Sequence, residues 1–381
     1  MDKHIVVIGS GFAAYQLVKS LRKIDNETPV TVITADSGDD YSKPELSHVF
    51  SRKQTASDLI KQSAKDFANA YSFELLAYTR VQSIDTEAKT VQLADKTVSY
   101  SELVLATGAS SFVPPFDGNA TDEIVTLNSL GEYASHQDKI ATAKSVLILG
   151  AGLIGTEIAM DLAEAGKQVA ICDRAGSIMP TLLPSFMGAE VFQTMTEKGV
   201  DVKLSSAVTG VNRHHQQLLV QFNNQSIIEA DVVIAAMGLK PNISLAKQAN
   251  IAVNQGIIVD EFLKTSANGV YALGDCAELG GKIRAFLQPT MLSAMALAKT
   301  LSGNPTPVRL PASLVKAKTP WFPLNLSGQT TRSDVSWEIT QDSDGYIAKA
   351  FEQDSETLVG FVVSHEQQKA AFPLLRQLPA E

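Results

Sequence analysis

Within the first 36 residues, the spacing of apolar side chains changes twice: from a continuous run to helical spacing, and back to a continuous run. Residues 4–9 are almost all Ile or Val, a run typical of a parallel strand buried on both faces. Residues 15–24 repeat their aliphatic side chains at helical spacing, and 29–36 form a second apolar run. Strand, helix and strand in this order predict a parallel βαβ unit.

A glycine-rich pattern, Gly9-Ser10-Gly11-Phe12-Ala13-Ala14, separates that strand from the helix. The first glycine permits a tight turn, the second lets a pyrophosphate approach the backbone, and the small Ala14 lets helix and strand pack closely. Free N–H groups at the start of the helix then face the phosphates. Asp36, at the end of the second run, can bind a ribose diol. The turn predicts a dinucleotide site; the alternative is a tightly turned βαβ unit without a ligand.

The same design returns at 146–173, where the turn reads Gly150-Ala151-Gly152-Leu153-Ile154-Gly155 and Asp173 ends the next strand. An acid there binds the 2′-hydroxyl of NAD and repels the 2′-phosphate of NADP. We therefore expect NADH to be preferred over NADPH, although the neighbouring Arg174 can partly accommodate a phosphate. Glu157 in the first helical turn has two interpretations. It is favoured there by the helix dipole, or it points toward a redox centre.

Two such turns in one chain predict two dinucleotides, a tightly but non-covalently held FAD and an exchanging NADH. Three further strands end in glycine, as in other parts of a flavoprotein scaffold. Residues 100–110 end in Ala106-Thr107-Gly108, 231–242 contain Gly238, and 269–278 contain Gly274 followed by Asp275. Asp275 is placed to bind a ribityl hydroxyl.

These segments resemble the FAD-dependent pyridine-nucleotide oxidoreductases. The resemblance implies an α/β fold with two Rossmann-like, glutathione-reductase-like domains for FAD and NAD, and a small α+β C-terminal domain. It places FAD on residues 1–115 and 241–305, NAD on the inserted 116–240, and the C-terminal domain at 306–381, covering the flavin and acceptor side.

A narrower resemblance, to the rubredoxin reductases and among them those that reduce flavorubredoxin, rests on "SKPELS", "ATGASSFVPP", "FLQP" and "VKAKTP". It places Lys43 and Pro44, and also Lys318, near the flavin, Val81 on the adenine side, and Glu157 and Leu287 beside the isoalloxazine. Lys43 and Glu157 would tune the charge around the ring; the alternative for Lys43 and Lys318 is solvated surface charge. Where relatives have a lysine after "PLS", this chain has His48, which leaves a lysine–glutamate pairing with Glu157 in doubt.

The resemblance implies an NADH-dependent reductase that passes electrons through FAD to the rubredoxin domain of flavorubredoxin, in nitric oxide detoxification. Other acceptors stay open: the rubredoxin of an alkane hydroxylase, or the [2Fe–2S] ferredoxin of a dioxygenase. A flavin-based NADH sensor with little turnover is an alternative of a different class.

The cysteines limit the chemistry. The chain has two, Cys172 and Cys276, neither in a CxxC pair and neither in the first flavin stretch, so disulfide-reductase chemistry is not expected. No histidines have metal-ligand spacing, so no metal is expected, and the flavin must carry the reaction.

A formal charge of −9 argues against nucleic acid as a partner, and no apolar run is long enough to span a bilayer. Lys3 before an apolar run superficially resembles a signal peptide, but glycines interrupt that run, so a cytoplasmic protein is expected. Residues 306–381 predict three strands and a closing helix. Arg309, Lys316 and Lys318 are candidates for steering a transient, acidic rubredoxin partner.

Overall fold

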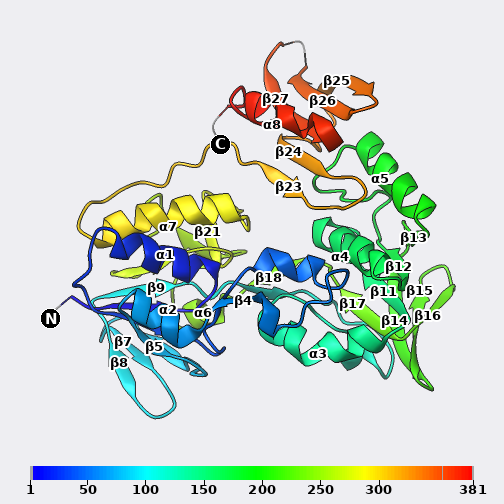
Figure 1. Cartoon of the computed structure of the whole chain (residues 1–381). Helices are drawn as coiled ribbons and strands as arrows, with labels where there is room; N and C mark the ends of the chain where they lie inside the picture. Colours follow the sequence, from blue (N-terminus) through cyan, green and yellow to red (C-terminus); the bar gives the residue numbers. More distant parts are fainter. Residues whose placement is uncertain (1–2, 354, 380–381) are drawn as a thin grey trace. The chain divides into compact units, whose positions relative to one another are not determined.

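The computed structural model describes residues 3–353 and 355–379, and its contacts divide the chain into two compact units (Figure 1). The first unit comprises the residues up to Lys43 together with Asp58–Ser110 and Leu239–Leu310. The second comprises Pro44–Ser57, Ser111–Gly238 and the described residues from Pro311 onward. Residues 44–57, which lie in the first flavin stretch of the sequence, thus belong by their contacts to the second unit.

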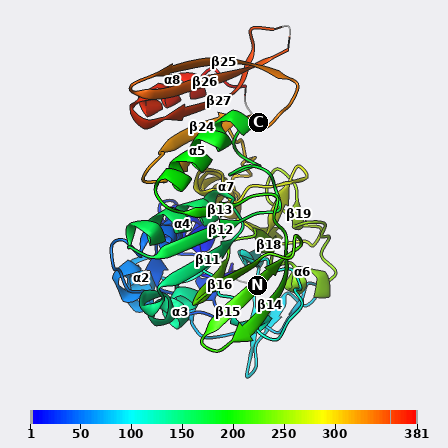
Figure 2. The ribbon, with the colours of Figure 1, turned by 90° about the vertical axis from the view of Figure 1, so that its right-hand side faces the viewer.

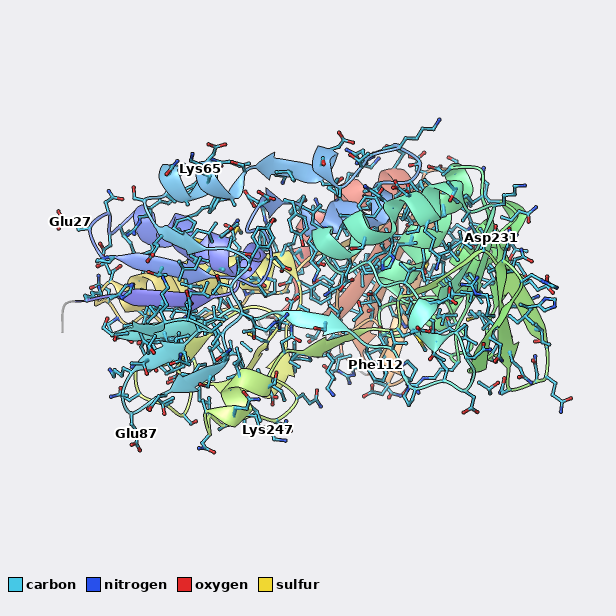
Figure 3. All side chains as sticks on the ribbon, turned by 90° about the horizontal axis from the view of Figure 1, so that it is seen from below. Glu27, Lys65, Glu87, Phe112, Asp231 and Lys247 are labelled. Carbon is cyan, nitrogen blue, oxygen red and sulfur yellow. The ribbon has the colours of Figure 1, made fainter. Side chains whose placement is uncertain are left out.

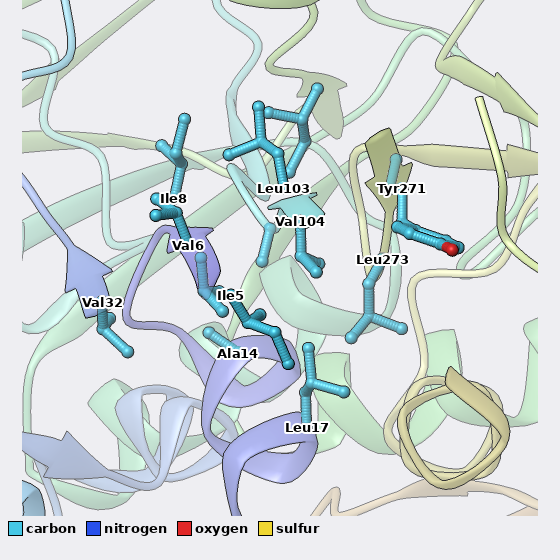
Figure 4. Packing of buried hydrophobic residues seen from close by; sticks show 14 of the residues in the cluster. Ile5, Val6, Ile8, Ala14, Leu17, Val32, Leu103, Val104, Tyr271 and Leu273 are labelled. Atoms are coloured by element: carbon cyan, nitrogen blue, oxygen red, sulfur yellow. The ribbon is translucent and has the colours of Figure 1, made fainter. Parts of the chain in front are cut away.

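A five-stranded parallel sheet forms the centre of the first unit. Its order is β20 (Val270–Ala272), β9 (Glu102–Leu105), β1 (Ile5–Ile8), β2 (Val30–Ile33) and β5 (Glu74–Leu76). Every residue of β1 is buried, as its continuous apolar run predicts, and these residues belong to one hydrophobic core with Ala14 and Leu17 of the helix that follows and with Leu103 and Val104 of β9 (Figure 4). This core fixes the carboxyl edge of the sheet, where the first glycine turn lies.

Helices and small antiparallel sheets surround this core. The helices are α1 (Phe12–Arg22), α2 (Ala64–Ala70), α6 (Ser244–Gln248) and α7 (Leu287–Leu301), of which α1 and α7 pack side by side (Figure 1). The short strands are β3 (Asp40–Tyr41), β4 (Ile60–Gln62), β6 (Ser83–Asp85), β7 (Thr90–Gln92), β8 (Thr97–Ser99), β10 (Ala109–Ser111), β18 (Leu239–Pro241), β19 (Ile257–Val259), β21 (Ala277–Leu279) and β22 (Lys282–Ile283). Charged side chains such as Glu27, Lys65, Glu87 and Lys247 project from the outside of this unit (Figure 3).

The second unit contains a second parallel sheet of the same kind. Its order is β13 (Asp201–Lys203), β12 (Gln168–Cys172), β11 (Ser145–Leu149) and β17 (Val232–Ala235). Its helices are α3 (Leu130–Thr142), α4 (Leu153–Glu164) and α5 (Ser185–Glu197). The antiparallel strands β14 (Val208–His214), β15 (Gln217–Phe222) and β16 (Ile227–Ala230) complete this part. The 3₁₀ turns are η1 (Lys43–His48), η2 (Ser57–Leu59) and η3 (Thr121–Glu123).

The C-terminal part of the second unit is a five-stranded antiparallel sheet with a short helix against it (Figure 2). Its order is β23 (Val315–Ala317), β24 (Leu324–Gly328), β27 (Leu358–Ser364), β26 (Gly345–Glu352) and β25 (Val335–Asp342). The three predicted strands are present as β25, β26 and β27. The predicted closing helix is instead a 3₁₀ segment, η4 (His365–Ala370), followed by the short α8 (Ala371–Leu375). Pro373 explains the break, because proline has no N–H to donate backward and its ring clashes with the preceding turn.

Candidate dinucleotide-binding sites and a buried acid cluster

The first glycine turn joins β1 to α1, and its two glycines differ in what surrounds them. Gly9 has φ +115°, and a Cβ added there would lie 2.2 Å from the Ala106 carbonyl oxygen. A Cβ on Gly11 would meet nothing within 4 Å. Gly9 is therefore required by the fold, whereas the space at Gly11 is left open. The start of α1 has no acidic residue and no side-chain cap, so its N–H groups are available to an anion.

Small residues also line the approach to Asp275. A Cβ on Gly274, which has φ +81°, would lie 2.6 Å from the Ala13 Cβ, so the "GD" segment packs directly on the first turn of α1. Burial raises the pKa of the Asp275 carboxyl, and the nearby Lys43 opposes that rise. A carboxyl in this place can accept hydrogen bonds from a diol, and Lys43 supplies a positive charge beside it.

The end of β9 is fixed by an asparagine that the sequence analysis did not single out. The Thr107 hydroxyl donates to the Asn242 carbonyl at 2.8 Å, and the Asn242 amide nitrogen donates to the Thr107 carbonyl at 2.8 Å. The Asn242 N–H also donates to the Gly108 carbonyl at 2.9 Å. Gly108 has φ +64°, and a Cβ there would meet nothing within 4 Å. The first unit thus brings Gly11, Thr107–Gly108 and Gly274–Asp275 to strand ends and turns around one sheet, and these residues fit an extended dinucleotide.

The other residues predicted to contact FAD are spread over both units. In the first unit, Asp36 is exposed three residues after β2 ends, Val81 and Ala106 are buried, and Phe12 and Leu287 are partly exposed at the starts of α1 and α7. Pro44, Glu157 and Lys318 belong to the second unit. The roles of all these residues toward FAD stay predictions.

The second glycine turn, between β11 and α4, repeats the first more strictly. Gly150 has φ +106° and faces the Ala236 carbonyl, 2.4 Å from the position of an added Cβ. A Cβ on Gly155 would lie 1.9 Å from the Gly150 carbonyl oxygen, whereas one on Gly152 would meet nothing within 4 Å. Leu153 and Ile154 begin α4, and Gly238, with φ +107°, follows β17. The open side of this turn at Gly152 also fits a dinucleotide.

Asp173 directly follows β12, and its carboxylate reaches the glycine turn. One oxygen accepts a hydrogen bond from the Ala151 N–H at 2.7 Å, and the other accepts from the Ala175 N–H at 2.8 Å. The carboxylate therefore lies where the adenosine ribose of a dinucleotide on this turn is expected. The neighbouring Arg174 is exposed.

Glu157 is a buried acid, with 4% of its surface exposed. One carboxylate oxygen accepts from the Ser47 hydroxyl at 2.7 Å, and the other accepts from the Lys318 backbone N–H at 2.9 Å. His48 Nε2 lies 3.7 Å from the first of these oxygens. The prediction that Glu157 lies in the first turn of its helix is wrong, because α4 begins at Leu153 and Glu157 is its fifth residue; its carboxylate instead holds two other segments. The titratable neighbour of Glu157 in this part of the second unit is thus a histidine rather than a lysine.

Asp161, one turn further along α4, binds the same segment. Its carboxylate accepts from the N–H groups of Phe50, at 2.7 Å, and Ser51, at 3.2 Å, and from the Ser51 hydroxyl. The side chain is 3% exposed. The sequence analysis missed it, but two acids four residues apart in an otherwise apolar helix are a signal that could have found it.

Lys318 is not simply solvated. Its amino group donates to Glu45 at 2.9 Å, and Arg52 donates to the other oxygen of the same carboxylate at 2.8 Å. Lys318 is the main cause of the lowered pKa of Glu45, with Arg52 adding to it. The two cations and Glu45 form a surface cluster next to the buried Glu157.

Both cysteines are enclosed. Burial is the main cause that raises the pKa of Cys172 to about 12, and it also raises the pKa of Cys276, which is fully buried. Their thiols are therefore poor nucleophiles at neutral pH. The prediction of inert thiols agrees with this. Among the residues that the structure describes, no group of three or more His, Cys, Asp or Glu is placed to hold a metal ion.

Comparison with known proteins places this arrangement in a family. Residues 3–299 match the pyridine nucleotide-disulphide oxidoreductases, and residues 307–378 match a rubredoxin binding C-terminal domain. The chain belongs to the pyridine nucleotide-disulphide oxidoreductase family of FAD- and NAD(P)-dependent reductases, and it carries a rubredoxin-binding domain behind the two dinucleotide turns.

Full-length relatives narrow the comparison. The chain is 47% identical to a nitric oxide reductase FlRd-NAD(+) reductase of Aliivibrio fischeri over 99% of both chains. It is also 47% identical to the protein of the same name from Escherichia coli over 100% of both chains. Among solved structures, a ferredoxin reductase from Rhodopseudomonas palustris superposes with a TM-score of 0.90 at 23% identity, covering 100% of this chain and 96% of the other. The predicted fold class and family are confirmed.

Proposed function

We propose that this protein is an NADH-dependent flavoprotein reductase that passes electrons through FAD to the rubredoxin domain of flavorubredoxin, in nitric oxide detoxification. The observation that carries the proposal is one chain with two open glycine turns and a rubredoxin-binding domain, similar over its full length to FlRd-NAD(+) reductases. A small, salt-sensitive interface suits such a brief encounter with the acceptor.

The first unit supplies the groups that would hold FAD. The N–H groups at the start of α1 would bind the pyrophosphate, and Asp275 would accept from a ribityl hydroxyl, with Lys43 as a fixed positive charge beside it. When bound, FAD takes up a pair of electrons from NADH and releases electrons singly to an iron centre. No side chain then needs to be a covalent catalyst, in agreement with the two enclosed thiols.

The second unit supplies the groups that would hold NADH. The N–H groups around Gly152 would bind its pyrophosphate, and the Asp173 carboxylate would accept from the 2′-hydroxyl of the adenosine ribose. The same carboxylate would repel a 2′-phosphate, which favours NADH over NADPH. Glu157 and Lys318, tied together by a hydrogen bond, would set the charge near the nicotinamide end of this turn.

The family description includes disulfide reduction, but this chain lacks the chemistry for it. Its two cysteines lie in different units, one ending β12 and the other following Asp275. Each is buried, and the pKa of each is raised by burial. Neither can offer a thiolate to a disulfide substrate at neutral pH.

The test is anaerobic stopped-flow spectroscopy of the FAD-loaded protein. NADH is expected to bleach the flavin absorbance rapidly, and oxidised rubredoxin, or the rubredoxin domain of flavorubredoxin, to restore it at least tenfold faster than a [2Fe–2S] ferredoxin. Faster reoxidation by the ferredoxin would contradict the proposed acceptor and indicate a [2Fe–2S] ferredoxin, as in a dioxygenase-type system. Bleaching that neither acceptor reverses would favour a sensor and contradict the proposal.

A further inference from the structure

His48 is a buried titratable side chain to which no function has yet been given. It ends η1, has 6% of its surface exposed, and its Nε2 has no hydrogen-bond partner among the residues that the structure describes. A buried polar nitrogen without a partner is costly and calls for a physical explanation. The atom lies 3.7 Å from the Glu157 carboxylate, slightly beyond hydrogen-bond distance.

Among the charged groups described around His48 and Glu157, none donates a charged hydrogen bond to the Glu157 carboxylate. On α4, Asp161 is satisfied by Phe50 and Ser51, whereas Glu157 receives only a hydroxyl and a backbone N–H. The basic groups nearest in the network, Lys318 and Arg52, both donate to Glu45 on η1. A buried carboxylate is strongly stabilised by a paired, hydrogen-bonded positive charge.

Histidine can provide that charge, and it does so reversibly, because its charge changes between about pH 5 and 8 in the absence of perturbation. In the protonated ring Nε2 is a donor, and a small approach to Glu157 would satisfy both buried groups at once. In the neutral ring the pair has no charge attraction.

We propose that His48 is a positioning residue whose protonated form fixes the Glu157 carboxylate and, through it, Ser47 and the Lys318 backbone. When His48 loses its proton as pH rises, the Glu157 carboxylate is no longer fixed by a positive charge. The reaction step that depends on the position of Glu157 then slows at higher pH. The proposal rests on the proposed function in one respect: the dependent step is taken to be electron uptake from NADH, since Glu157 lies on α4, the helix that begins within the Gly150–Gly155 turn.

The kinetic test uses His48→Lys, which keeps a charge at all accessible pH values, and His48→Gln, which never carries one. For the FAD-loaded wild type, the rate of flavin bleaching by NADH is expected to fall about fivefold from pH 6 to pH 9, an effect in the range of one charge-assisted hydrogen bond. His48→Lys should stay near the fast, low-pH rate and His48→Gln near the slow, high-pH rate. His214→Gln, at an exposed hairpin position, serves as the matched control and should keep the wild-type profile.

A second readout does not depend on turnover. In histidine-selective NMR, the signal lost in His48→Gln identifies the His48 ring, and its titration in the wild type is expected to move to lower pH in Glu157→Gln, where the carboxylate charge is gone. Parallel pH–rate profiles in wild type, His48→Lys and His48→Gln would overturn the proposal, as would a titration that Glu157→Gln leaves in place. If NADH bleaches none of the proteins, the proposed function fails. The NMR titration still tests whether His48 interacts with Glu157.

Discussion

Two glycines of the second turn differ in the space around them, so substitution by alanine should affect stability at one and ligand binding at the other. Gly155→Ala would place a Cβ 1.9 Å from the Gly150 carbonyl, so we expect about 2–4 kcal/mol lower free energy of unfolding. Gly152→Ala has open space and an ordinary φ of −73°, so its stability should change by less than about 0.5 kcal/mol. Its affinity for NADH should nevertheless fall at least about tenfold, because the methyl group takes the place of the pyrophosphate.

Urea unfolding and NADH titration of the two variants check this contrast. Unchanged NADH binding by a stable Gly152→Ala protein would mean that the second glycine turn does not bind NADH.

The Asp173 carboxylate is expected to decide between the two nicotinamide cofactors. In Asp173→Ala the repulsion of a 2′-phosphate and the acceptor for a 2′-hydroxyl are both lost, so the NADH/NADPH ratio of kcat/KM should fall about tenfold or more. The carboxylate also accepts from Ala151, so a modest loss of stability should accompany the change. Steady-state kinetics with both cofactors measure the ratio, with Asp201→Ala, an exposed acid on β13, as the control. An unchanged ratio would argue that another residue sets the preference.

The sequence could predict the residues whose constraint is local. The glycine positions and the acids that end the strands follow from the geometry of one βαβ turn, so spacing alone identifies them. The partners of Glu157 are different. Ser47 and Lys318 are 110 and 161 residues away, and no short motif relates such distant positions. From the sequence, His48 was noted only as a departure from the pattern of the family it resembles. Its position beside Glu157 is seen only in the structure.

At the scale of elements, helix α4 anchors a distant segment by two acids on one face. Replacing Asp161 with Asn removes the charge that three donors of Phe50 and Ser51 recognise. The two backbone N–H groups, which share one carboxylate oxygen, then have only a neutral amide oxygen, and the amide N–H₂ faces the Ser51 hydroxyl. We expect the free energy of unfolding to fall by about 1–3 kcal/mol. The amides of Phe50 and Ser51 should also exchange with solvent at least about tenfold faster, since their shared acceptor becomes neutral and binds them more weakly.

Chemical denaturation and hydrogen exchange followed by mass spectrometry measure the two effects. Asp138→Asn, an exposed acid on α3, is the matched control and should change neither. Normal protection of residues 44–57 in a destabilised Asp161→Asn protein would mean that other contacts hold the segment.

Element types were predictable where the pattern was strong. The strands β25 and β26 alternate polar and apolar positions around a tight turn, whereas β1, β11 and β27 are nearly continuous apolar runs, so period alone identifies both kinds. β24, with the sequence LNLSG, alternates apolar and polar residues over only four positions and was missed, because so short a pattern is ambiguous and its burial depends on pairing with β27. The split of the closing helix was likewise missed, although Pro373 was visible in the sequence.

At the scale of the whole molecule, charge is expected to govern the encounter with the acceptor. Lys316 and Lys318 follow the alternation of β23, and both are exposed, but Lys318 is already paired with Glu45. Lys316→Ala should therefore slow rubredoxin reduction more than Lys318→Ala does, by about twofold to fivefold at low salt. Raising the ionic strength should shrink this difference, because screening weakens the long-range attraction.

Stopped-flow rates with rubredoxin measure this effect, with ferricyanide as a small acceptor that needs no docking. Lys198→Ala, an exposed lysine after α5, provides the charge-matched control. Equal salt dependence for both acceptors would count against steering. No helix among the described residues is long and apolar enough to cross a membrane.

The alternation of the chain between the two units has a consequence for its synthesis. Residues 44–57 leave the ribosome long before α4, whose acids hold them, and β1 and β9 leave it long before β20, which completes their sheet. The sheet of the first unit is complete only when β20 has been made, so the growing chain carries the unpaired edge of β9 until then. A release of the chain after residue 238 would leave both halves unfinished, and such fragments are natural substrates for chaperones and proteases.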